Sequence, residues 1–349
     1  MLQGAIIGFA GVAVLDITLQ WIDHLRKNRP FTWESFNCTR TLKNALIGTA
    51  VGAGVGYLAY ENIILKESES LFDSDDFLKK ILSAESIKSN HTLFNKYLSY
   101  KTDVKQLLNE KFGQKLVCAP EDTGSFFKRT AVISNCDLDV MLPFKKDSYT
   151  TLEEMYYDVY DTLHKNFGNK AIVSKQTKAI GLTFEYNGLP IHFDIVPGRE
   201  INNYKSTKEV NLYVRPDLVW QKGSSFKTNI GLQKKVTTNL PAARRIIKLL
   251  KTYREKNNLT IPSVLIEHCV CDALSGNRYG TSFSDTENLL NSMMHIANKL
   301  DQNCIVDTAN SNNNLLEKIS YDEKLSCSTQ LKKDIKRIEN SSRYIKEIF

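Results

Sequence analysis

The sequence predicts an α/β (α+β) fold: a small mixed β-sheet core followed by a helical lobe, with an apolar helical hairpin at the amino terminus. Three observations support this prediction. Residues 137–142 and 191–196 alternate polar and apolar side chains with the period of a β-strand. Residues 240–300 place apolar side chains at the spacing of amphipathic helices. Residues 1–65 contain two long apolar runs separated by a charged linker.

These features divide the chain into three predicted domains: the glycine-rich hairpin over residues 1–65, the sheet core over residues 66–205, and the helical lobe over residues 206–349. With 349 residues, 42% hydrophobic and 24% charged, the chain can bury a sizeable core, and its composition excludes dominant disorder. Its net charge of +7 suits nucleic acid, anionic lipid and phosphate groups alike. Seven cysteines without a framework spacing indicate reduced thiols.

Three aspartates are the candidate catalytic residues and metal ligands: Asp137, Asp139 and Asp194. In a strand over residues 137–142 the apolar side chains face the core, so Asp137 and Asp139 share the opposite face. The segment 191–196 repeats the pattern, and a neighbouring strand in register would bring Asp194 beside them. Adjacent carboxylates repel one another unless a cation neutralises them. Mg²⁺ prefers hard oxygen ligands, and two such ions about 3.5–4 Å apart could activate a hydroxyl and stabilise a leaving pyrophosphate.

A phosphate-binding turn is predicted upstream, at Gly124 and Ser125. Glycine lets the backbone approach a phosphate closely, the following amides can donate to it, and the Ser125 hydroxyl adds another donor. Lys128 and Arg129 follow within one turn and could contribute positive charge. Each of these pieces alone is most often structural, whereas their order along the chain favours a nucleotide-binding site.

A basic amphipathic helix is predicted from residue 241 onward. One face of this helix is an apolar stripe, and Arg244, Lys248 and Lys251 lie on another face at the i, i+4, i+7 spacing, so their charges could converge on phosphates. A solvated charged face is the alternative for Arg244 and Lys248. We also expect helices over most of residues 75–112, from Pro262, over residues 284–300 and over residues 331–349, with an ordered turn at residues 310–314.

The residues Gly124-Ser125, Asp137-x-Asp139 and the later Asp194 resemble the polymerase-beta-type nucleotidyltransferases. Within them, the chain is most similar to the cyclic-oligonucleotide synthases of bacteria and animals (the cGAS/DncV-like group) and to oligoadenylate synthases. The basic helix with its following Pro262-Ser263 step, and the segment 305–314, resemble that group's helical-lobe signatures. The resemblance covers about residues 68–325.

This resemblance implies a nucleotidyltransferase core with Asp137, Asp139 and Asp194 as ligands of two Mg²⁺ ions, or of Mn²⁺, and with Ser125, Lys251 and Ser263 on the triphosphate. It implies an enzyme of the EC 2.7.7 type that makes a cyclic or linear oligonucleotide second messenger from nucleoside triphosphates, ATP among them, in antiphage defence. A downstream effector would respond to the product. Val264 stands where the group often has an aromatic residue, so the nucleobase stays open.

Two alternatives use the same residues. The chain could transfer nucleotides to RNA, as transfer-RNA nucleotidyltransferases and toxins of similar build do, with nucleic acid as acceptor rather than as activator. It could also be a membrane effector or scaffold whose nucleotidyltransferase-like domain only senses a nucleotide. A small soluble product made without added RNA would distinguish a synthase of an oligonucleotide messenger from both alternatives.

The apolar hairpin over residues 1–65 predicts membrane association. Its glycines form small-xxx-small steps, which allow close helix packing in a bilayer, although the second run of 17 residues is at the short edge of a span. We expect the catalytic domain to face the cytoplasm at the bacterial inner membrane. By the positive-inside rule the basic linker would itself stay cytoplasmic, which would place the catalytic domain on the other side of the membrane. The expected orientation therefore requires an exception to that rule, or a hairpin that is re-entrant, interfacial or buried in an oligomer.

Overall fold

The structure is a computed structural model that describes residues 72–133, 136–216, 218, 221–235, 237, 240–275 and 281–349. The chain divides at Asp73, and Ser74–Phe349, the second of its two units, is compact. The apolar hairpin predicted for residues 1–65 lies outside the described residues. Among the residues that are described, no helix is both long and apolar enough to cross a bilayer.

A mixed β-sheet forms the centre of the second unit, as the sequence predicts. Its strands are β1 (Glu121–Thr123), β2 (Asp137–Phe144), β3 (Ala171–Lys175), β4 (Ile180–Tyr186), β5 (Leu189–Glu200), β6 (Glu209–Val214) and β7 (Ser224–Asn229). The order is β1-β2-β5-β4-β3, and β6 joins β5 to β7. The pair β2 and β5 is parallel, whereas the other pairs are antiparallel. The two strands predicted to carry the aspartates are therefore neighbours.

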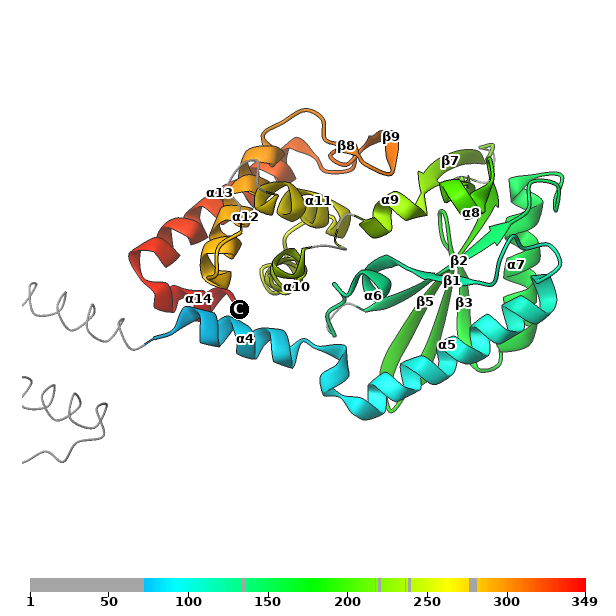
Figure 1. Ribbon diagram of the computed structural model, residues 1–349, viewed down its shortest axis with the longest axis horizontal. Coiled ribbons are helices and arrows are strands. Elements are labelled where there is room, and N and C mark those ends of the chain that lie inside the picture. Colours follow the sequence, from blue (N-terminus) through cyan, green and yellow to red (C-terminus); the bar gives the residue numbers. More distant parts are fainter. Residues whose placement is uncertain are drawn as a thin grey trace, which may run out of the picture. The chain divides into compact units, whose positions relative to one another are not determined.

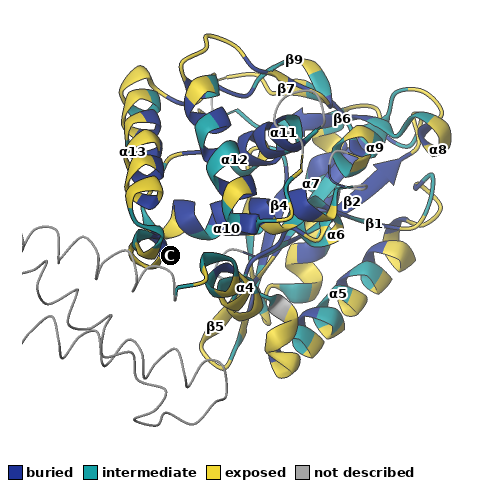
Figure 2. Cartoon of the chain, turned by 60° about the vertical axis from the view of Figure 1, so that its left-hand side comes forward, coloured by how far each residue is buried: buried dark blue, intermediate teal, exposed yellow. Residues whose placement is uncertain are grey.

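Two helices cover one face of this sheet: α5 (His91–Phe112) and α7 (Leu152–Phe167) (Figure 1). Their apolar side chains form one core with those of the strands, including Leu138, Val140 and Phe193. Figure 2 shows buried residues concentrated in β2, β4 and the helices packed nearby. Because strand side chains alternate, the polar residues of β2 and β5 are left on the opposite face.

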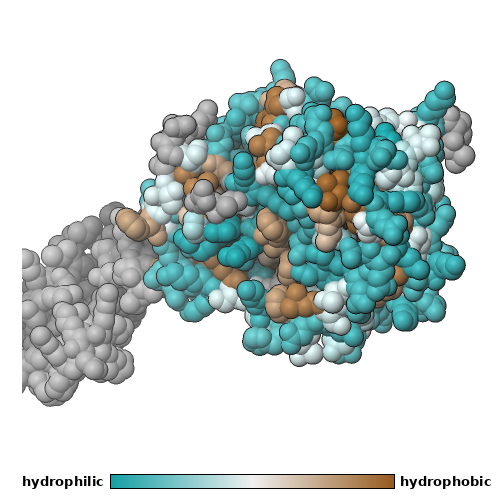
Figure 3. All heavy atoms as spheres, turned by 45° about the vertical axis from the view of Figure 1, so that its right-hand side comes forward, coloured by the Kyte–Doolittle hydropathy of each residue, from teal (hydrophilic) through white to brown (hydrophobic). Residues whose placement is uncertain are grey.

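The second part of the unit is a group of helices: α10 (Pro241–Lys256), α11 (Ser263–Leu274), α12 (Asp285–Leu300), α13 (Tyr321–Asn340) and the short α14 (Ile345–Ile348). The helix α4 (Ser74–Ala84) precedes the sheet in sequence but packs against α10 and α12. Shorter elements are α6 (Gly124–Lys128), α8 (Tyr204–Thr207), α9 (Ile230–Lys235), β8 (Val306–Asp307) and β9 (Asn310–Asn314). Figure 3 shows one face of the molecule, on which hydrophilic residues dominate and hydrophobic ones form small groups.

Two element predictions are wrong. The helix predicted over residues 331–349 begins at Tyr321, because Ser320 and Glu323 form a capping box, and it ends at Asn340. The turn predicted at residues 310–314 is the strand β9, which pairs with β8.

The boundary predicted between the sheet core and the helical lobe stays a prediction. The sheet continues beyond residue 205, since β6 and β7 extend it to Asn229.

Candidate active site

The three predicted aspartates lie on neighbouring strands and on the same side of the sheet. In the parallel pairing of β2 with β5, Asp139 lies opposite Asp194, and Asp137 lies opposite His192. Leu138 and Val140 point into the core, as the alternation predicts. Parallel neighbours are about 4.8 Å apart across the sheet, so the register brings Asp194 beside the pair on β2.

The turn at Gly124 lies directly against Asp139. Gly124 begins α6 with φ of +62°, and a Cβ placed on it would overlap the carboxylate of Asp139. Glycine is thus required here both for the backbone conformation and for space. The predicted phosphate-binding turn and the first pair of carboxylates are therefore parts of one site.

Burial and like charge dominate the electrostatics of the carboxylates. Burial, followed by the charges of Asp194 and Asp137, raises the pKa of Asp139 to about 7. Burial also raises the pKa of Asp194, a shift to which Asp137 adds and which Gln176 opposes. These side chains are close enough to disfavour one another's ionisation, which is the state that a bound cation relieves.

Asp194 has a hydrogen-bond partner of its own. The Nε2 atom of Gln176 donates to its Oδ1 atom at 2.8 Å. Gly181 on β4 pairs with Asp194 across the sheet, and a Cβ on Gly181 would stand 2.8 Å from the Nε2 of Gln176. The Tyr156 hydroxyl lies 2.9 Å from the main-chain oxygen of Gln176 and anchors this segment. Gln176 therefore orients Asp194, and Gly181 leaves room for it.

A pocket of about 230 Å³ opens between the carboxylates and the helical lobe. Its lining residues are Ser125, Lys128, Asp137, Asp139, Lys251, Ser263, Val264 and Glu267. Five of the residues predicted from the sequence to bind phosphate or metal line this pocket: Ser125, Asp137, Asp139, Lys251 and Ser263. Lys128 lines it as well, whereas the predicted Gly124 and Asp194 are not among its lining residues. The predicted Arg244 and Lys248 are not among the lining residues, and both are partly buried on α10, so the choice between phosphate binding and a solvated face stays open for them.

Glu267 connects the basic residues of this pocket. Lys128 and Lys251 both form salt bridges with its carboxylate, Lys251 at 3.0 Å, and Lys251 also lies 3.4 Å from the Thr130 hydroxyl. Glu267 is 5% exposed and Lys251 3%. Although burial opposes it, the two lysines lower the pKa of Glu267, so the carboxylate stays ionised. One buried anion thus holds a lysine of α6 and a lysine of α10 at the same wall.

Ser263, predicted to contact the triphosphate, lies at the first position of α11 and lines the same pocket. The Nη1 atom of Arg254 donates to its hydroxyl oxygen at 2.8 Å, and the same atom donates to the main-chain oxygen of Ile261. Because the Ser263 oxygen accepts from Arg254, its hydroxyl hydrogen can donate to a ligand in the pocket.

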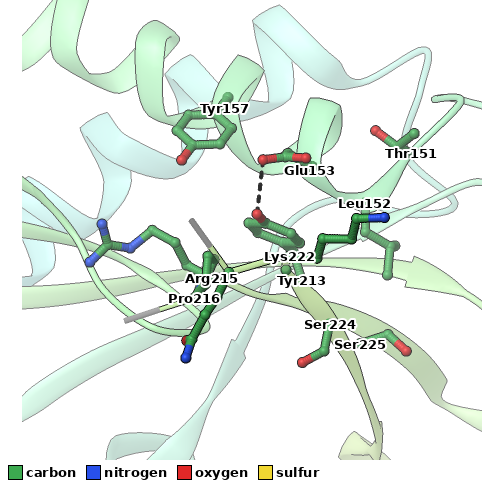
Figure 4. Close-up of a pocket in the computed structure, with 12 residues that line it drawn as sticks. Thr151, Leu152, Glu153, Tyr157, Tyr213, Arg215, Pro216, Lys222, Ser224 and Ser225 are labelled. Atoms are coloured by element: carbon green, nitrogen blue, oxygen red, sulfur yellow. Dashed lines mark hydrogen bonds between the residues drawn. The ribbon is translucent and has the colours of Figure 1, made fainter. Parts of the chain in front are cut away.

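A larger cavity of about 860 Å³ lies elsewhere, between α7 and the β6–β7 hairpin (Figure 4). Tyr157, Tyr213, Arg215 and Lys222 are among its lining residues, and the Tyr213 hydroxyl donates to Glu153 at 2.9 Å. It shares no lining residue with the pocket of Asp137 and Asp139. Since Glu153 is the only carboxylate among its described lining residues, the smaller pocket is the better candidate for chemistry.

No protein-family model and no curated protein matches this sequence, but solved structures do. CdnG, a CD-NTase of Bradyrhizobium diazoefficiens solved in complex with GTP, is 13% identical at a TM-score of 0.62, covering 79% of this chain and 98% of its own. CdnC of E. coli MS115-1, solved with HORMA-deltaN, is 18% identical at a TM-score of 0.53, covering 70% and 84%. The DncV cyclic AMP-GMP synthase of Vibrio cholerae, solved with nonhydrolyzable GTP, is 12% identical at 0.52, covering 66% and 67%.

The chain has the CD-NTase fold. The resemblance that the sequence motifs indicate is thereby confirmed for the fold. In this CD-NTase fold Asp137 and Asp139 of β2, Ser125 of α6 and Lys251 of α10 line one pocket from three different elements.

The carboxylate oxygens of the candidate site suit Mg²⁺ as ligands. Within the described ranges, no three His, Cys, Asp or Glu side chains stand ready to enclose an ion. The fit lies instead in the ligand type, because carboxylate oxygens are the donors that Mg²⁺ prefers. It lies also in the burial and the neighbouring negative charges that together raise the pKa of Asp139, since a bound cation would relieve both. Asp137, Asp139 and Asp194 are the residues that would hold the metal.

Two site residues were not predicted from the sequence. Glu267 follows Ser263 by four positions on α11, and this i, i+4 spacing is a signal that could have indicated a shared face. Gln176 lies between β3 and β4, and no local pattern marks it. Its contact with Asp194 depends on how the strands pair.

Proposed function

We propose that this protein is a Mg²⁺-dependent nucleotidyltransferase that joins nucleoside triphosphates into a cyclic or linear oligonucleotide second messenger. The observation that carries the proposal is the register of β2 with β5, which pairs Asp139 with Asp194 beside the turn at Gly124. Two carboxylate-bearing strands, a phosphate-binding turn and a facing lysine are the groups that nucleotidyl transfer requires.

The roles follow from position. Ser125 on α6 and Lys251 on α10 bind the triphosphate in the pocket that both line, and the Ser263 hydroxyl donates to it. Divalent metal, when bound, supplies positive charge to the developing pyrophosphate. Asp194 accepts the proton of the attacking hydroxyl, and the hydrogen bond from the Nε2 of Gln176 to its Oδ1 holds the carboxylate in place.

The proposed substrates are nucleoside triphosphates. CdnG was solved with GTP and CdnC with ATP, and this chain has the same fold. We place the product in antiphage defence as a signal for a downstream effector. We also propose that residues 1–65 associate with the bacterial inner membrane and that the catalytic domain faces the cytoplasm.

The test is incubation of the full chain with the four nucleoside triphosphates and Mg²⁺, without nucleic acid, followed by mass spectrometry of the products. We expect a small oligonucleotide and pyrophosphate. Asp139→Asn should lower turnover by at least about a hundredfold, since even partners of metal ligands contribute 10–100-fold. The matched control Asp161→Asn, on the exposed side of α7, should leave turnover unchanged.

Two outcomes contradict the proposal. Folded protein that forms no nucleotidyl product under any metal or triphosphate condition, with or without added nucleic acid, would argue that the site only binds. Labelled RNA in the absence of a small soluble product would identify a transferase to RNA instead.

A further inference from the structure

A second, smaller cavity adjoins the pocket of the carboxylates. It measures about 160 Å³ and is lined by Lys128, Gln233, Val264, Glu267, His268, Asp307, Thr308 and Leu315. Lys128, Val264 and Glu267 line both spaces, so the two adjoin at these side chains. A nucleotide whose phosphates contact Lys128 can extend past Val264 into this second cavity.

Asp307 presents a fixed carboxylate to the cavity. It is 8% exposed, and its two oxygens are held by different donors of its own hairpin: Oδ1 accepts from the main-chain N–H of Ala309 at 2.8 Å, and Oδ2 from the Nδ2 of Asn313 at 2.9 Å. A carboxylate has about four lone-pair sites, so both oxygens can still accept from a ligand. The geometry of β8 and β9 thus supplies a rigid acceptor edge.

Two further groups add acceptor capacity. The Nε2 of Gln233 donates to the Thr228 hydroxyl at 3.0 Å, which leaves its Oε1 available. Across the described part of the chain, neither that Oε1 nor the ring of His268 has a hydrogen-bond partner. Burial lowers the pKa of His268, so the ring is neutral and one nitrogen is an acceptor. The polar lining away from Lys128 therefore mainly accepts hydrogen bonds.

We propose that this cavity holds the nucleobase of a substrate triphosphate and selects guanine through Asp307. Among the four bases, guanine alone presents two adjacent N–H donors, N1–H and the 2-amino group, on its Watson–Crick edge, which a carboxylate accepts together. Adenine and cytosine place a ring-nitrogen acceptor beside their amino group, and uracil flanks its single N–H with carbonyls. Each of these three bases would place an acceptor atom next to a carboxylate oxygen of Asp307, and the two acceptors would repel one another. This inference rests on the proposed function, because it assumes that phosphates occupy the neighbouring pocket.

The first test compares ligands on the unmodified full chain. Equilibrium binding is measured for GTP, ITP, ATP, CTP and UTP, with Ca²⁺ in place of Mg²⁺ to prevent turnover. ITP lacks only the 2-amino group of guanine. We expect GTP to bind about tenfold more tightly than ITP, and ATP, CTP and UTP to bind more weakly than ITP, because hydrogen bonds to a charged acceptor contribute about 1.5–3 kcal/mol each.

The second test changes the acceptor. Asp307→Asn replaces one carboxylate oxygen with a donor, and the ratio of the ATP to the GTP dissociation constant should fall about tenfold. The matched control is Asp301→Asn. Asp301 lies at the end of α12 and pairs with Lys332, so this substitution should leave the ratio of dissociation constants unchanged. Circular dichroism establishes whether each variant folds. If Asp307→Asn does not fold, the comparison of GTP with ITP decides the question.

Equal binding of ITP and GTP, or binding of ATP, CTP or UTP as tight as that of GTP, overturns the guanine assignment. The transferase proposal would then stand, because its product assay is independent of base preference. Binding of no triphosphate at all would overturn both.

Discussion

Asp139 is buried beside two other carboxylates, and its titration should therefore influence the stability of the metal-free protein. Its pKa of about 7 lies above the ordinary 3.8, so the folded state binds more protons than the unfolded state between these values. The free energy of unfolding must then fall as the pH rises through this window. Bound metal should reverse the effect, because it stabilises the ionised form.

We predict that, in the presence of a chelator, the thermal unfolding midpoint of the wild-type chain falls relative to that of Asp139→Asn as the pH rises from 4 to 7. The variant carries no titrating group at this position, so the difference between the two isolates Asp139. The measurement is thermal unfolding followed by circular dichroism. Parallel midpoints across the window would show that this carboxyl titrates normally.

The hydrogen bond from Gln176 to Asp194 predicts a coupled effect. Gln176→Ala removes the bond, and Gly181→Ala displaces the same amide, so each should lower turnover by about 10–100-fold. The double variant should be no worse than the more impaired single variant, because both act on one contact. Initial rates give these values, and additive losses would show that the two residues act separately.

The sequence predicted individual residues well where their signal is local. The alternation in β2 orients Asp137 and Asp139 without reference to the rest of the chain, and the capping pattern at Ser284 gives the start of α12, where Ser284 accepts from the Glu287 amide. The roles of Gln176 and Glu267 have no local signal. Gln176 contacts Asp194, 18 residues away, and Glu267 contacts Lys128, 139 residues away.

At the scale of elements, the buried ion pairs of Glu267 connect α11 with α6 and α10. This arrangement places two lysines where phosphate would bind, while the single carboxylate of Glu267 offsets part of their positive charge in the absence of ligand. A buried carboxylate with two such partners cannot be removed without leaving lysine charge uncompensated.

We predict that Glu267→Ala lowers the free energy of unfolding by about 3–5 kcal/mol, the range for breaking a buried ion pair. Glu267→Gln should cost less, since it retains an acceptor for one lysine. The control Glu317→Ala changes an exposed glutamate near β9 and should be neutral. Chemical denaturation measures all three. A Glu267→Ala variant as stable as the control would show that the ion pairs contribute nothing to the fold.

Element boundaries were the less predictable feature. The start of α13 is set by Ser320 and Glu323, ten residues before the apolar and basic pattern that drew attention to residue 331. The run of asparagines at residues 310–314 looks like a turn by composition, but pairing with β8 makes it a strand that helps to hold Asp307. Tertiary pairing therefore overrides a weak local preference.

At the scale of the whole molecule, the fold follows from one long-range arrangement: a parallel pair of strands within an otherwise antiparallel sheet, which brings residues 137–139 and 194 together. The motifs predicted this arrangement because their order along the chain is specific. Composition and net charge are compatible with many folds and did not predict it. The helical lobe then closes the pocket with Lys251 and Ser263.

The apolar amino-terminal hairpin yields a prediction for the entire chain. We expect the full-length protein to sediment with membranes and to be released by detergent but not by salt, because apolar burial rather than charge holds it there. A chain lacking residues 1–65 should remain in the supernatant. Fractionation with immunodetection measures this, and a full-length protein that stays in the supernatant would contradict the membrane assignment.

The proposed function depends most on the carboxylates of β2 and β5 sharing divalent cations. Anomalous diffraction from crystals grown with Mn²⁺ and a non-hydrolysable nucleoside triphosphate tests it directly. We predict Mn²⁺ peaks within coordination distance of Asp137, Asp139 and Asp194, with the phosphates toward Ser125 and Lys251. An ordered triphosphate with Mn²⁺ bound away from these three aspartates would contradict the account.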